Sequence, residues 1–114
     1  MKLKNVLIVV DDIERSKAFY KELFGLSVIL DGEANVMMSG GLVLQDRRVW
    51  ENAIGNEVCY KGCDTLLYFE DSDLKSFQKK LDESGYGIEY VTKEESIIRM
   101  YDLDGHIIEI RQVL

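Results

Sequence analysis

The hydrophobic and polar positions of this chain follow two periods, and the change from one to the other predicts its elements. The run "KNVLIVV" (4–10) is short and rich in β-branched residues, which is typical of a strand. From 11 to 24 the apolar residues return at helical spacing, and Gly25 is placed to end a helix in the left-handed conformation. Three more strands are then predicted, with turns at "DGE" and "GG", over 26–30, 34–39 and 42–47.

The first helix has a predicted start and one apolar face. Asp11, with Glu14 three residues later, matches a capping box, in which a side chain accepts a hydrogen bond from the first turn. The residues expected to face the core are Ile13, Phe19, Tyr20, Leu23 and Phe24.

The second half of the chain repeats this order of elements. A strand is predicted over 65–70, followed by a helix in 71–86 that Gly85 or Gly87 closes. Leu74, Phe77 and Leu81 are expected to face inward. Three strands follow, with "DLDG" as the turn before the last, over 87–92, 96–102 and 106–113.

Single residues support the repeat. Asp12 corresponds to Asp73 at an offset of 61 residues, and "GLVLQ" (41–45) corresponds to "GHIIE" (105–109) at an offset of 64. One βαβββ unit is therefore used twice in an α+β fold. Each unit is a small sheet with a helix on one face, and two such units curled together make a half-open, eight-stranded mixed-sheet cup with the helices outside.

The chain is accordingly expected to be one domain, residues 1–114, of two modules. Module one covers about 1–47 and module two covers 64–114. The segment between them, 48–63, shows no clear period and is expected to be a bridge.

Charge and hydropathy narrow the range of partners. With 14 basic and 21 acidic residues the net charge is −7, so no basic stripe is available for nucleic acid or an anionic membrane. This charge suits a cationic or neutral ligand better than a polyanion. No apolar stretch reaches the roughly 18 residues of a membrane span. Because acidic residues come directly after the first apolar run, we interpret that run as a strand and expect a cytoplasmic protein.

Few residues suit nucleophilic or zinc chemistry. Cys59 and Cys63 have no second cysteine pair to join them, and His106 is the only histidine, so a structural zinc site is not expected. The two cysteines are interpreted as reduced thiols near a connection. Ser96 or Cys63 would need a neighbouring general base to act as a nucleophile, and none can be assigned.

Two stretches resemble a known superfamily. "VVDDIERSKAFYKELFGL" (9–26) and "YDLDGHIIEI" (101–110) are similar to signature segments of the glyoxalase, bleomycin-resistance and extradiol-dioxygenase proteins, also called vicinal oxygen chelate proteins. The resemblance covers both modules. Leu103 departs from it, because the family usually has proline there, which makes the turn more rigid. The resemblance implies a cup of eight strands that, in the enzymes of the family, holds a divalent metal.

The resemblance also implies four metal-ligand positions. In this chain they are occupied by Asn5, Gln45, Leu66 and Glu109. Leucine cannot bind a metal, and one carboxylate with two amides is a poor site for Zn²⁺ or Ni²⁺. No metal cofactor is therefore expected, and if one is bound, its ligands are Gln45 and Glu109. Strand alternation places His106 on the opposite face from Glu109, toward the helix or the solvent.

Alternation predicts which other residues line the cup. A mixture of apolar and polar side chains of this kind is typical of a small-molecule pocket. The opposing interpretation is that the charged members lie at the rim, solvated or paired with one another. In the bridge, Trp50 is expected either to stack on a ligand or to pack at a dimer contact. The expected ligand-binding residues are Asn5, Leu7, Gln45, Arg47, Trp50, Leu66, Tyr68, Glu70 and Arg111.

Three functions are compatible with these residues. The first, which we favour, is a homodimeric protein that binds a small molecule without metal, in the manner of drug-sequestering proteins. The second is a glyoxalase-like lyase or isomerase, in which a metal on Gln45 and Glu109 polarises the substrate and Glu109 also transfers a proton. The third is a ligand-sensing domain without chemistry. Ring-cleaving dioxygenase activity fits least, because it needs two histidines and a carboxylate for iron.

Overall fold

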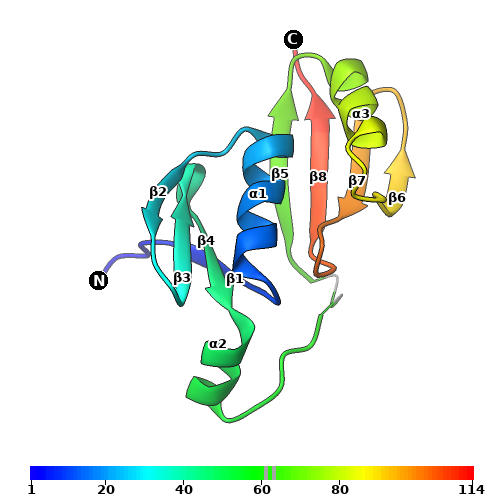
Figure 1. Ribbon diagram of the computed structural model, residues 1–114. Helices are drawn as coiled ribbons and strands as arrows, with labels where there is room; N and C mark the ends of the chain where they lie inside the picture. Colours follow the sequence, from blue (N-terminus) through cyan, green and yellow to red (C-terminus); the bar gives the residue numbers. More distant parts are fainter. Residues whose placement is uncertain (61, 63) are drawn as a thin grey trace. The chain divides into compact units, whose positions relative to one another are not determined.

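The computed structural model describes residues 1–60, 62 and 64–114. The chain forms two compact units, Met1–Val58 and Cys59–Leu114, and both are drawn in Figure 1. The boundary falls inside the segment 48–63 that was expected to link the modules. Cys63, interpreted from the sequence as a reduced thiol, lies outside the described residues.

The first unit is a four-stranded sheet with a helix against it. Its sheet has the order β1-β4-β3-β2, in which β1 runs parallel to β4 and the other neighbours are antiparallel. A 3₁₀ turn at Ser39–Gly41 joins β3 to β4, and Gly40 and Gly41 both have positive φ there. The elements are β1 (Val6–Val10), α1 (Ile13–Phe24), β2 (Val28–Asp31), β3 (Asn35–Met38), β4 (Leu42–Asp46) and α2 (Arg47–Ile54).

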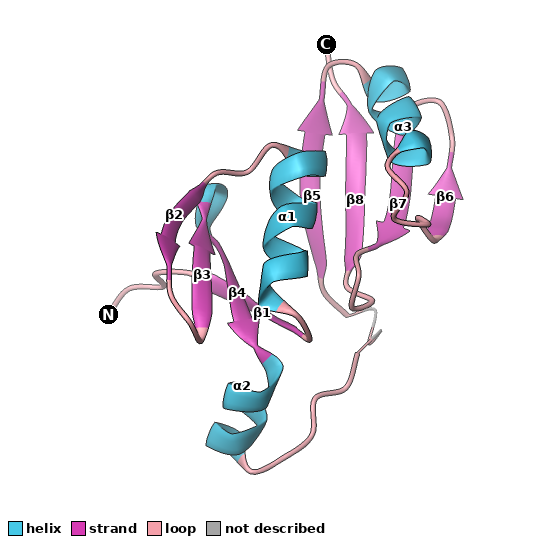
Figure 2. Ribbon diagram, viewed as in Figure 1, coloured by secondary structure: helices cyan, strands magenta, loops and turns pink. Residues whose placement is uncertain are grey.

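The second unit repeats this topology. Its sheet has the order β5-β8-β7-β6, with β5 parallel to β8 and antiparallel pairing elsewhere (Figure 2). The two βαβββ modules predicted from the repeat are thus confirmed, each with its own mixed four-stranded sheet. The elements are β5 (Leu66–Asp71), α3 (Leu74–Glu83), β6 (Tyr90–Lys93), β7 (Ile97–Tyr101) and β8 (Ile107–Gln112).

The two main helices begin in the same way. Asp12 accepts a hydrogen bond from the amide of Arg15 at 3.1 Å, and Asp73 accepts one from the amide of Ser76 at 3.1 Å. The capping residue of α1 is therefore Asp12, and its prediction at Asp11 was wrong by one position. Gly25 ends α1 in the left-handed conformation, as predicted, with φ of 68°.

Each helix buries its apolar face on the adjoining sheet. Val36 and Leu44 are cross-strand neighbours and fully buried, and α1 packs on the strands that carry them. In the second unit α3 packs on β8, and Figure 1 shows it lying against that sheet. Burying one such side chain contributes about 1.5–3 kcal/mol, so these layers hold each module together. The buried helix residues are Ile13, Ser16, Phe19, Tyr20 and Leu23 in α1, and Leu74, Phe77 and Leu81 in α3.

The segment interpreted as an irregular bridge begins with a helix. The side chain of Asp46 accepts a hydrogen bond from the amide of Val49 at 3.0 Å, which starts α2, and Gly55 ends it with φ of 67°. Arg47 is therefore the first residue of α2, and its predicted place on the preceding strand was wrong. No residue of α2 is buried, and its large apolar residues Val49, Trp50 and Ile54 are exposed.

The pairing of β1 with β4 moves Asn5 away from its expected place. Gln45 pairs with Val9, which is three residues before the helix cap Asp12. Glu109 pairs with Tyr68, which is five residues before the helix cap Asp73. Counted from the helix caps, the first and last strands of the two modules therefore pair in registers that differ by two residues. Leu7 consequently occupies the place in unit one that Leu66 occupies in unit two. Asn5 lies before β1 and outside the paired residues. A shift of two residues preserves which face each side chain points to, so it cannot be detected from alternation.

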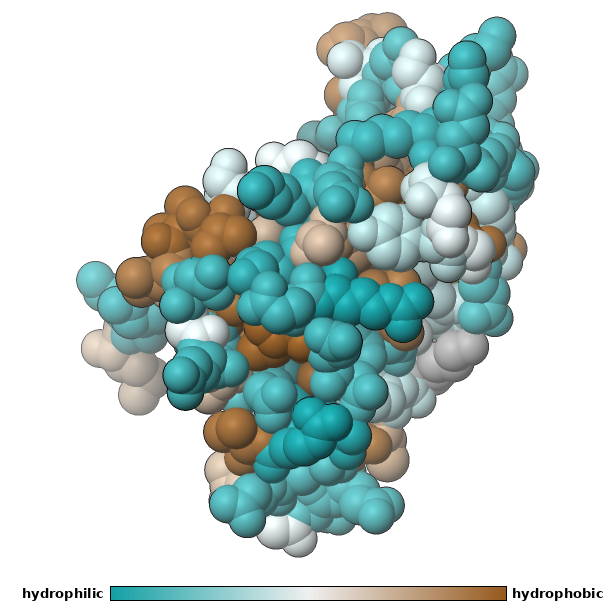
Figure 3. Space-filling view, viewed as in Figure 1, coloured by the Kyte–Doolittle hydropathy of each residue, from teal (hydrophilic) through white to brown (hydrophobic). Residues whose placement is uncertain are grey.

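Some apolar side chains remain on the surface. Ile29 and Leu30 of β2, which is an edge strand, are both exposed. Figure 3 shows a hydrophobic patch at the position of β2 on a face that is otherwise mostly hydrophilic. No helix within the described residues is long and apolar enough to cross a membrane.

Candidate functional site

One face of the second sheet brings together most of the predicted residues of module two. Along β5, Leu66, Tyr68 and Glu70 are exposed and alternate with residues that are partly covered. On β8, Glu109 alternates with Ile108 and Ile110, which are buried on the α3 side. The predicted face is therefore present, and we call it the Glu109 face: Leu66, Tyr68, Glu70, Thr92, Ile97, Arg99, Tyr101, Ile107, Glu109 and Arg111.

The register across three strands arranges this face in rows. Tyr68 pairs with Glu109, and Glu109 pairs with Arg99, so these three form the middle row. An apolar row lies on one side of it, and on the other side Arg111 lies between Glu70 and Ile97. The face thus changes from apolar to charged along the strands. The apolar row consists of Leu66, Ile107 and Tyr101.

Glu109 is held by two arginines. Its Oε1 accepts a hydrogen bond from Nε of Arg99 at 2.8 Å, and its Oε2 accepts one from Nε of Arg111 at 3.0 Å. The Glu109 side chain is only 12% exposed. The hydrogen bonds from Arg111 and then Arg99 lower the pKa of Glu109 below its usual value. Glu109 is therefore an anion whose two oxygens both have cationic partners.

Arg99 was missed in the sequence, where the run "SIIRMYD" indicated only a strand. Its Nη1 also donates to Oγ1 of Thr92 at 3.3 Å, so the guanidinium bridges β8 and β6 from its position on β7. Alternation along β7 places Arg99 on one face with Ile97 and Tyr101, but alternation alone does not say which residue of β8 lies opposite. Only the strand pairing brings it to Glu109.

Tyr68 and Glu70 form a second polar pair on this face. The hydroxyl of Tyr68 donates to Oε2 of Glu70 at 3.0 Å. This hydrogen bond is the main reason that the pKa of Tyr68 is raised, because removing the proton would place two anions side by side. Glu70 is thus directed toward Tyr68, and no ion pair joins it to Arg111 in the described structure.

The side chain of Gln45 is hydrogen-bonded to the backbone of its own unit. It lies on β4 in the first unit and is 7% exposed. Its Nε2 donates to the carbonyl oxygens of Ala34 at 3.2 Å and Asp46 at 3.3 Å. The amide group therefore joins the turn between β2 and β3 to the end of β4. These hydrogen bonds satisfy a buried polar group, as is usual in folded proteins.

The residues at the implied metal positions do not fit a divalent ion. Both oxygens of Glu109 already accept hydrogen bonds from guanidinium groups, which would repel a cation placed beside them. Leu66 has no donor atom, and Gln45 offers only a neutral amide oxygen, which is a weak ligand for a transition metal. Asn5 lies outside β1. Transition metals need several strong donors in one place, and these positions do not supply them.

The remaining predicted residues lie in the first unit. Leu7 is about half exposed on β1, and Trp50 is exposed on α2. The guanidinium of Arg47 is ion-paired with Asp11 at 2.6 Å and Glu51 at 2.8 Å, which raises its pKa further. Arg47 is therefore held by acidic partners of its own unit.

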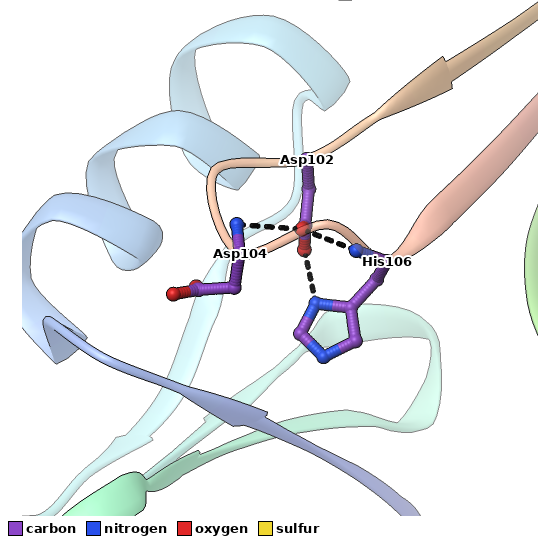
Figure 4. Close-up of side chains that lie close together, drawn as sticks. All are labelled: Asp102, Asp104 and His106. Carbon is purple, nitrogen blue, oxygen red and sulfur yellow. Dashed lines mark hydrogen bonds and ion pairs between the residues drawn. The ribbon is translucent and has the colours of Figure 1, made fainter. Parts of the chain in front are cut away.

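The turn before β8 brings together three side chains of types that can bind a metal ion. Ligand atoms of Asp102, Asp104 and His106 lie within 4.8 Å of one another (Figure 4). However, Oδ1 of Asp102 accepts hydrogen bonds from the amides of Asp104 and His106, both at 2.9 Å, and its Oδ2 lies 2.7 Å from Nδ1 of His106. The buried carboxylate thus holds the "DLDG" turn closed, and we interpret the cluster as structural.

His106 lies beside two side chains of the second unit. Its side chain is 22% exposed, its Nδ1 lies 2.7 Å from Oδ2 of Asp102, and its ring meets the ring of Tyr60 edge-on, with centroids 5.8 Å apart. Cys59, close to Tyr60 in the chain, is an exposed free thiol.

Two surface pockets are lined by residues that do not belong to the Glu109 face. One, of about 540 Å³, is in the first unit and is lined mainly by acidic side chains around the start of α1. The other, of about 860 Å³, lies in the second unit beside α3 and has mixed charge. In the first pocket, the carboxylates of Asp12 and Asp46 already cap helices. Two of the acidic residues that line this pocket therefore serve to cap helices.

Comparisons with known proteins agree on one family. The family model for the glyoxalase-like domain matches residues 3–114. A protein of unknown function from Agrobacterium tumefaciens is 28% identical over 100% of this chain and 95% of its own, with a TM-score of 0.80. A glyoxalase-related enzyme from Fulvimarina pelagi is 18% identical over 98% of this chain and 88% of its own, with a TM-score of 0.76.

A fosfomycin resistance protein from Listeria monocytogenes is also similar in structure. It is 17% identical over 99% of this chain and 92% of its own, with a TM-score of 0.70. At this level of identity the likeness concerns the fold alone. No curated protein sequence matches the chain. Since the family model covers nearly every residue and the paired βαβββ modules are present, this chain belongs to the glyoxalase-like domain family.

Proposed function

We propose that this protein binds a small molecule on the Glu109 face and does so without a metal ion on Glu109. The observation that carries the proposal is the pair of ion pairs on that carboxylate, 2.8 Å to Arg99 and 3.0 Å to Arg111. In this arrangement the guanidinium groups supply the positive charge that a cation would otherwise provide.

The composition of the Glu109 face supports binding of a small organic molecule. Leu66 and Tyr68 are each 51% exposed, so they offer an apolar and an aromatic surface. Beside them lie the polar groups of Tyr68, Arg99 and Arg111, which can fix the orientation of a ligand. Pockets for small molecules combine these features, with apolar area for affinity and a few polar groups for specificity.

A metal-dependent lyase is less well supported. It would need Glu109 to exchange both arginine partners for a metal and then to accept a proton. The same hydrogen bonds lower the pKa of Glu109, which makes it a weaker base, whereas a general base works best with a pKa near the working pH. A ligand-sensing domain would bind its ligand in the same way and differ only in passing the signal to a partner, and no contact on the Glu109 face favours that role.

The metal part of the proposal is tested by incubating purified protein with Ni²⁺, Zn²⁺ or Fe²⁺, removing free ions and measuring the metal that remains. We expect no stoichiometric metal and no rise in melting temperature, because only a ligand of the native state raises it. Stoichiometric metal that is lost in Glu109→Ala and retained in the control Glu70→Ala would overturn the proposal.

The binding part is tested with the same melting-temperature assay and a panel of planar cationic, 2-oxo and carboxylate compounds. A compound that stabilises the wild type should lose its effect in Tyr68→Ala. If no compound of any class raises the melting temperature, or if the effect survives in Tyr68→Ala, binding on this face is rejected.

The proposal includes a homodimer that associates through an outer strand. The exposed Ile29 and Leu30 on edge strand β2 support this, because an apolar edge strand is prone to pair with another chain. Sedimentation at micromolar concentration should show a dimer that Leu30→Lys dissociates. A monomeric wild type would contradict this part.

A further inference from the structure

We propose that the ligand of the Glu109 face carries a single carboxylate, which Arg111 and Arg99 bind, and an apolar group that lies on Leu66. This inference rests on the proposed function and adds the chemical class of the ligand. Three features of the face support it: its hydrogen-bond donors, its charges and the spacing of its rows.

The arginines retain donors that Glu109 does not use. Each contributes only its Nε to Glu109, and Arg99 additionally uses Nη1 for Thr92. Among the described residues, no acceptor binds Nη1 or Nη2 of Arg111, whose side chain is 50% exposed. A guanidinium presents five N–H donors in one plane, which match the two oxygens of a carboxylate. Arg111 therefore retains exposed donors that can bind a planar anion.

The charge of the cluster matches one negative charge. Arg99 and Arg111 together carry two positive charges, and Glu109 neutralises one of them. Glu70 is the other acid nearby, but its carboxylate is directed to the hydroxyl of Tyr68 and, in the described part of the chain, forms no ion pair with Arg111. A ligand with one negative charge would therefore bring the total charge of Arg99, Arg111 and Glu109 with the ligand to zero. A dianion would leave a charge unpaired, and the net charge of −7 on the whole chain disfavours it further.

The apolar row sets the shape of the rest of the ligand. Leu66 is two residues before Tyr68 on β5, and Ile107 is two residues before Glu109 on β8. Residues two apart on a strand are roughly 7 Å apart. Arg111 itself lies one row beyond Glu109, but its Nε is 3.0 Å from Oε2 of Glu109, so its guanidinium reaches the Glu109 row. A ligand with its carboxylate at that guanidinium and its apolar group on Leu66 must span at least this distance. An arylalkanoate such as 3-phenylpropionate has that length and chemistry.

The experiment titrates the full-length protein with 3-phenylpropionate and follows the arginine side-chain signals by NMR. Three matched probes accompany it: the neutral 3-phenylpropionamide, the cationic 3-phenylpropylamine and inorganic phosphate. We expect saturable binding of the carboxylate that exceeds the other three by about tenfold or more, because the amide and the amine lose the charge-assisted pair and phosphate has no apolar group for Leu66. Arg111→Gln should weaken it by about tenfold, while Arg48→Gln on α2, which makes the same change in net charge, leaves it unchanged.

A second variant tests the assignment in the opposite direction. Glu70→Gln removes a negative charge next to the proposed subsite, so the carboxylate should bind more tightly, while the fold, checked by the backbone NMR spectrum, stays the same. Weaker or unchanged binding in Glu70→Gln would count against the subsite even if Arg111→Gln unfolds the protein.

The outcomes separate this inference from the proposed function. Equal or tighter binding of the amide, the amine or phosphate on the Glu109 face overturns the carboxylate assignment and leaves small-molecule binding in place. Stoichiometric metal on Glu109 overturns both. If 3-phenylpropionate does not bind, or if its affinity does not depend on Arg111, the inference is wrong.

Discussion

Arg99 lies directly across from Glu109 in the pairing of β7 with β8, and its Nε donates to Oε1 of Glu109 at 2.8 Å. Cross-strand partners on one face of a sheet are its main side-chain contacts, so this pair forms part of the sheet itself. Arg111 lies on the same strand as Glu109, and its Nε donates a hydrogen bond to the other carboxylate oxygen, Oε2. The consequence is a carboxylate kept ionised by its neighbours.

The pKa of Glu109 should therefore rise when either arginine is removed. In Arg111→Gln the larger cause of the lowering is lost, and in Arg99→Gln the second cause is lost. Carboxyl carbon signals followed by NMR across a pH titration measure the change. Arg48→Gln serves as control and should leave the pKa of Glu109 where it is. An unchanged pKa in both arginine variants would show that these contacts do not persist in solution.

The buried carboxylate of Asp102 should be essential for the stability of the second unit. Asp102→Ala leaves the amides of Asp104 and His106 without the acceptor that each has now, and we expect a loss of about 2 kcal/mol in the free energy of unfolding. Asp102→Asn keeps an oxygen for the amides and should cost less. Urea denaturation measures both.

The variant His106→Ala tests whether the cluster of Asp102, Asp104 and His106 is a structural turn or a metal site. It removes the contact with Asp102 but none of the backbone hydrogen bonds, so its effect on stability should be smaller than that of Asp102→Ala. Added divalent ions should not stabilise the wild type in a manner that His106→Ala abolishes. If they do, the turn binds a cation and its structural interpretation fails.

Gln45 should contribute to stability rather than to metal binding. Gln45→Leu has a similar size but cannot donate to the carbonyl oxygens of Ala34 and Asp46, so we expect a loss of about 1 kcal/mol. Gln78→Leu, on a half-buried position of α3, is the control and should stay within about 0.5 kcal/mol of the wild type. A neutral or stabilising Gln45→Leu, measured in urea, would contradict this role.

Tyr90 and Asp82 make the stability of the second unit depend on pH. The hydroxyl of Tyr90 donates to Oδ1 of Asp82 at 2.7 Å, and this bond is the main cause that lowers the pKa of Asp82, with help from Lys93. Burial and the same hydrogen bond raise the pKa of Tyr90. Because the pKa of Asp82 is lower in the folded state, its contribution to stability is present above the ordinary carboxyl pKa and is lost as the pH falls through the folded value.

Tyr90→Phe should therefore destabilise the protein more at neutral pH than in acid, and should move the pKa of Asp82 back toward its ordinary value. Tyr68→Phe is the matched control, since its hydroxyl donates to Glu70 and not to Asp82. Urea denaturation at several pH values gives the first quantity and NMR titration the second. A stability difference that is the same at every pH would exclude this coupling.

The sequence predicted the elements well because local signals specify them. Alternation placed Tyr68, Glu70, Glu109 and Arg111 on one face, and that face is present. The spacing of Asp12 and Asp73 predicted the repeat, and both residues cap helices. Two local features were missed: the cap lies one residue later than predicted, and the segment expected to be a bridge begins with α2.

The amino-acid sequence by itself determined the order of elements and the face to which each side chain points, because both depend on periods of a few residues along the chain. Tertiary structure alone decided which residues meet across strands: Arg99 with Glu109, Val9 with Gln45, and Leu7 in the place expected for Asn5. A shift of two residues leaves every side chain on its own face but changes its neighbour. The composition of the site therefore depends on hydrogen-bonded register, which residue periodicity does not encode.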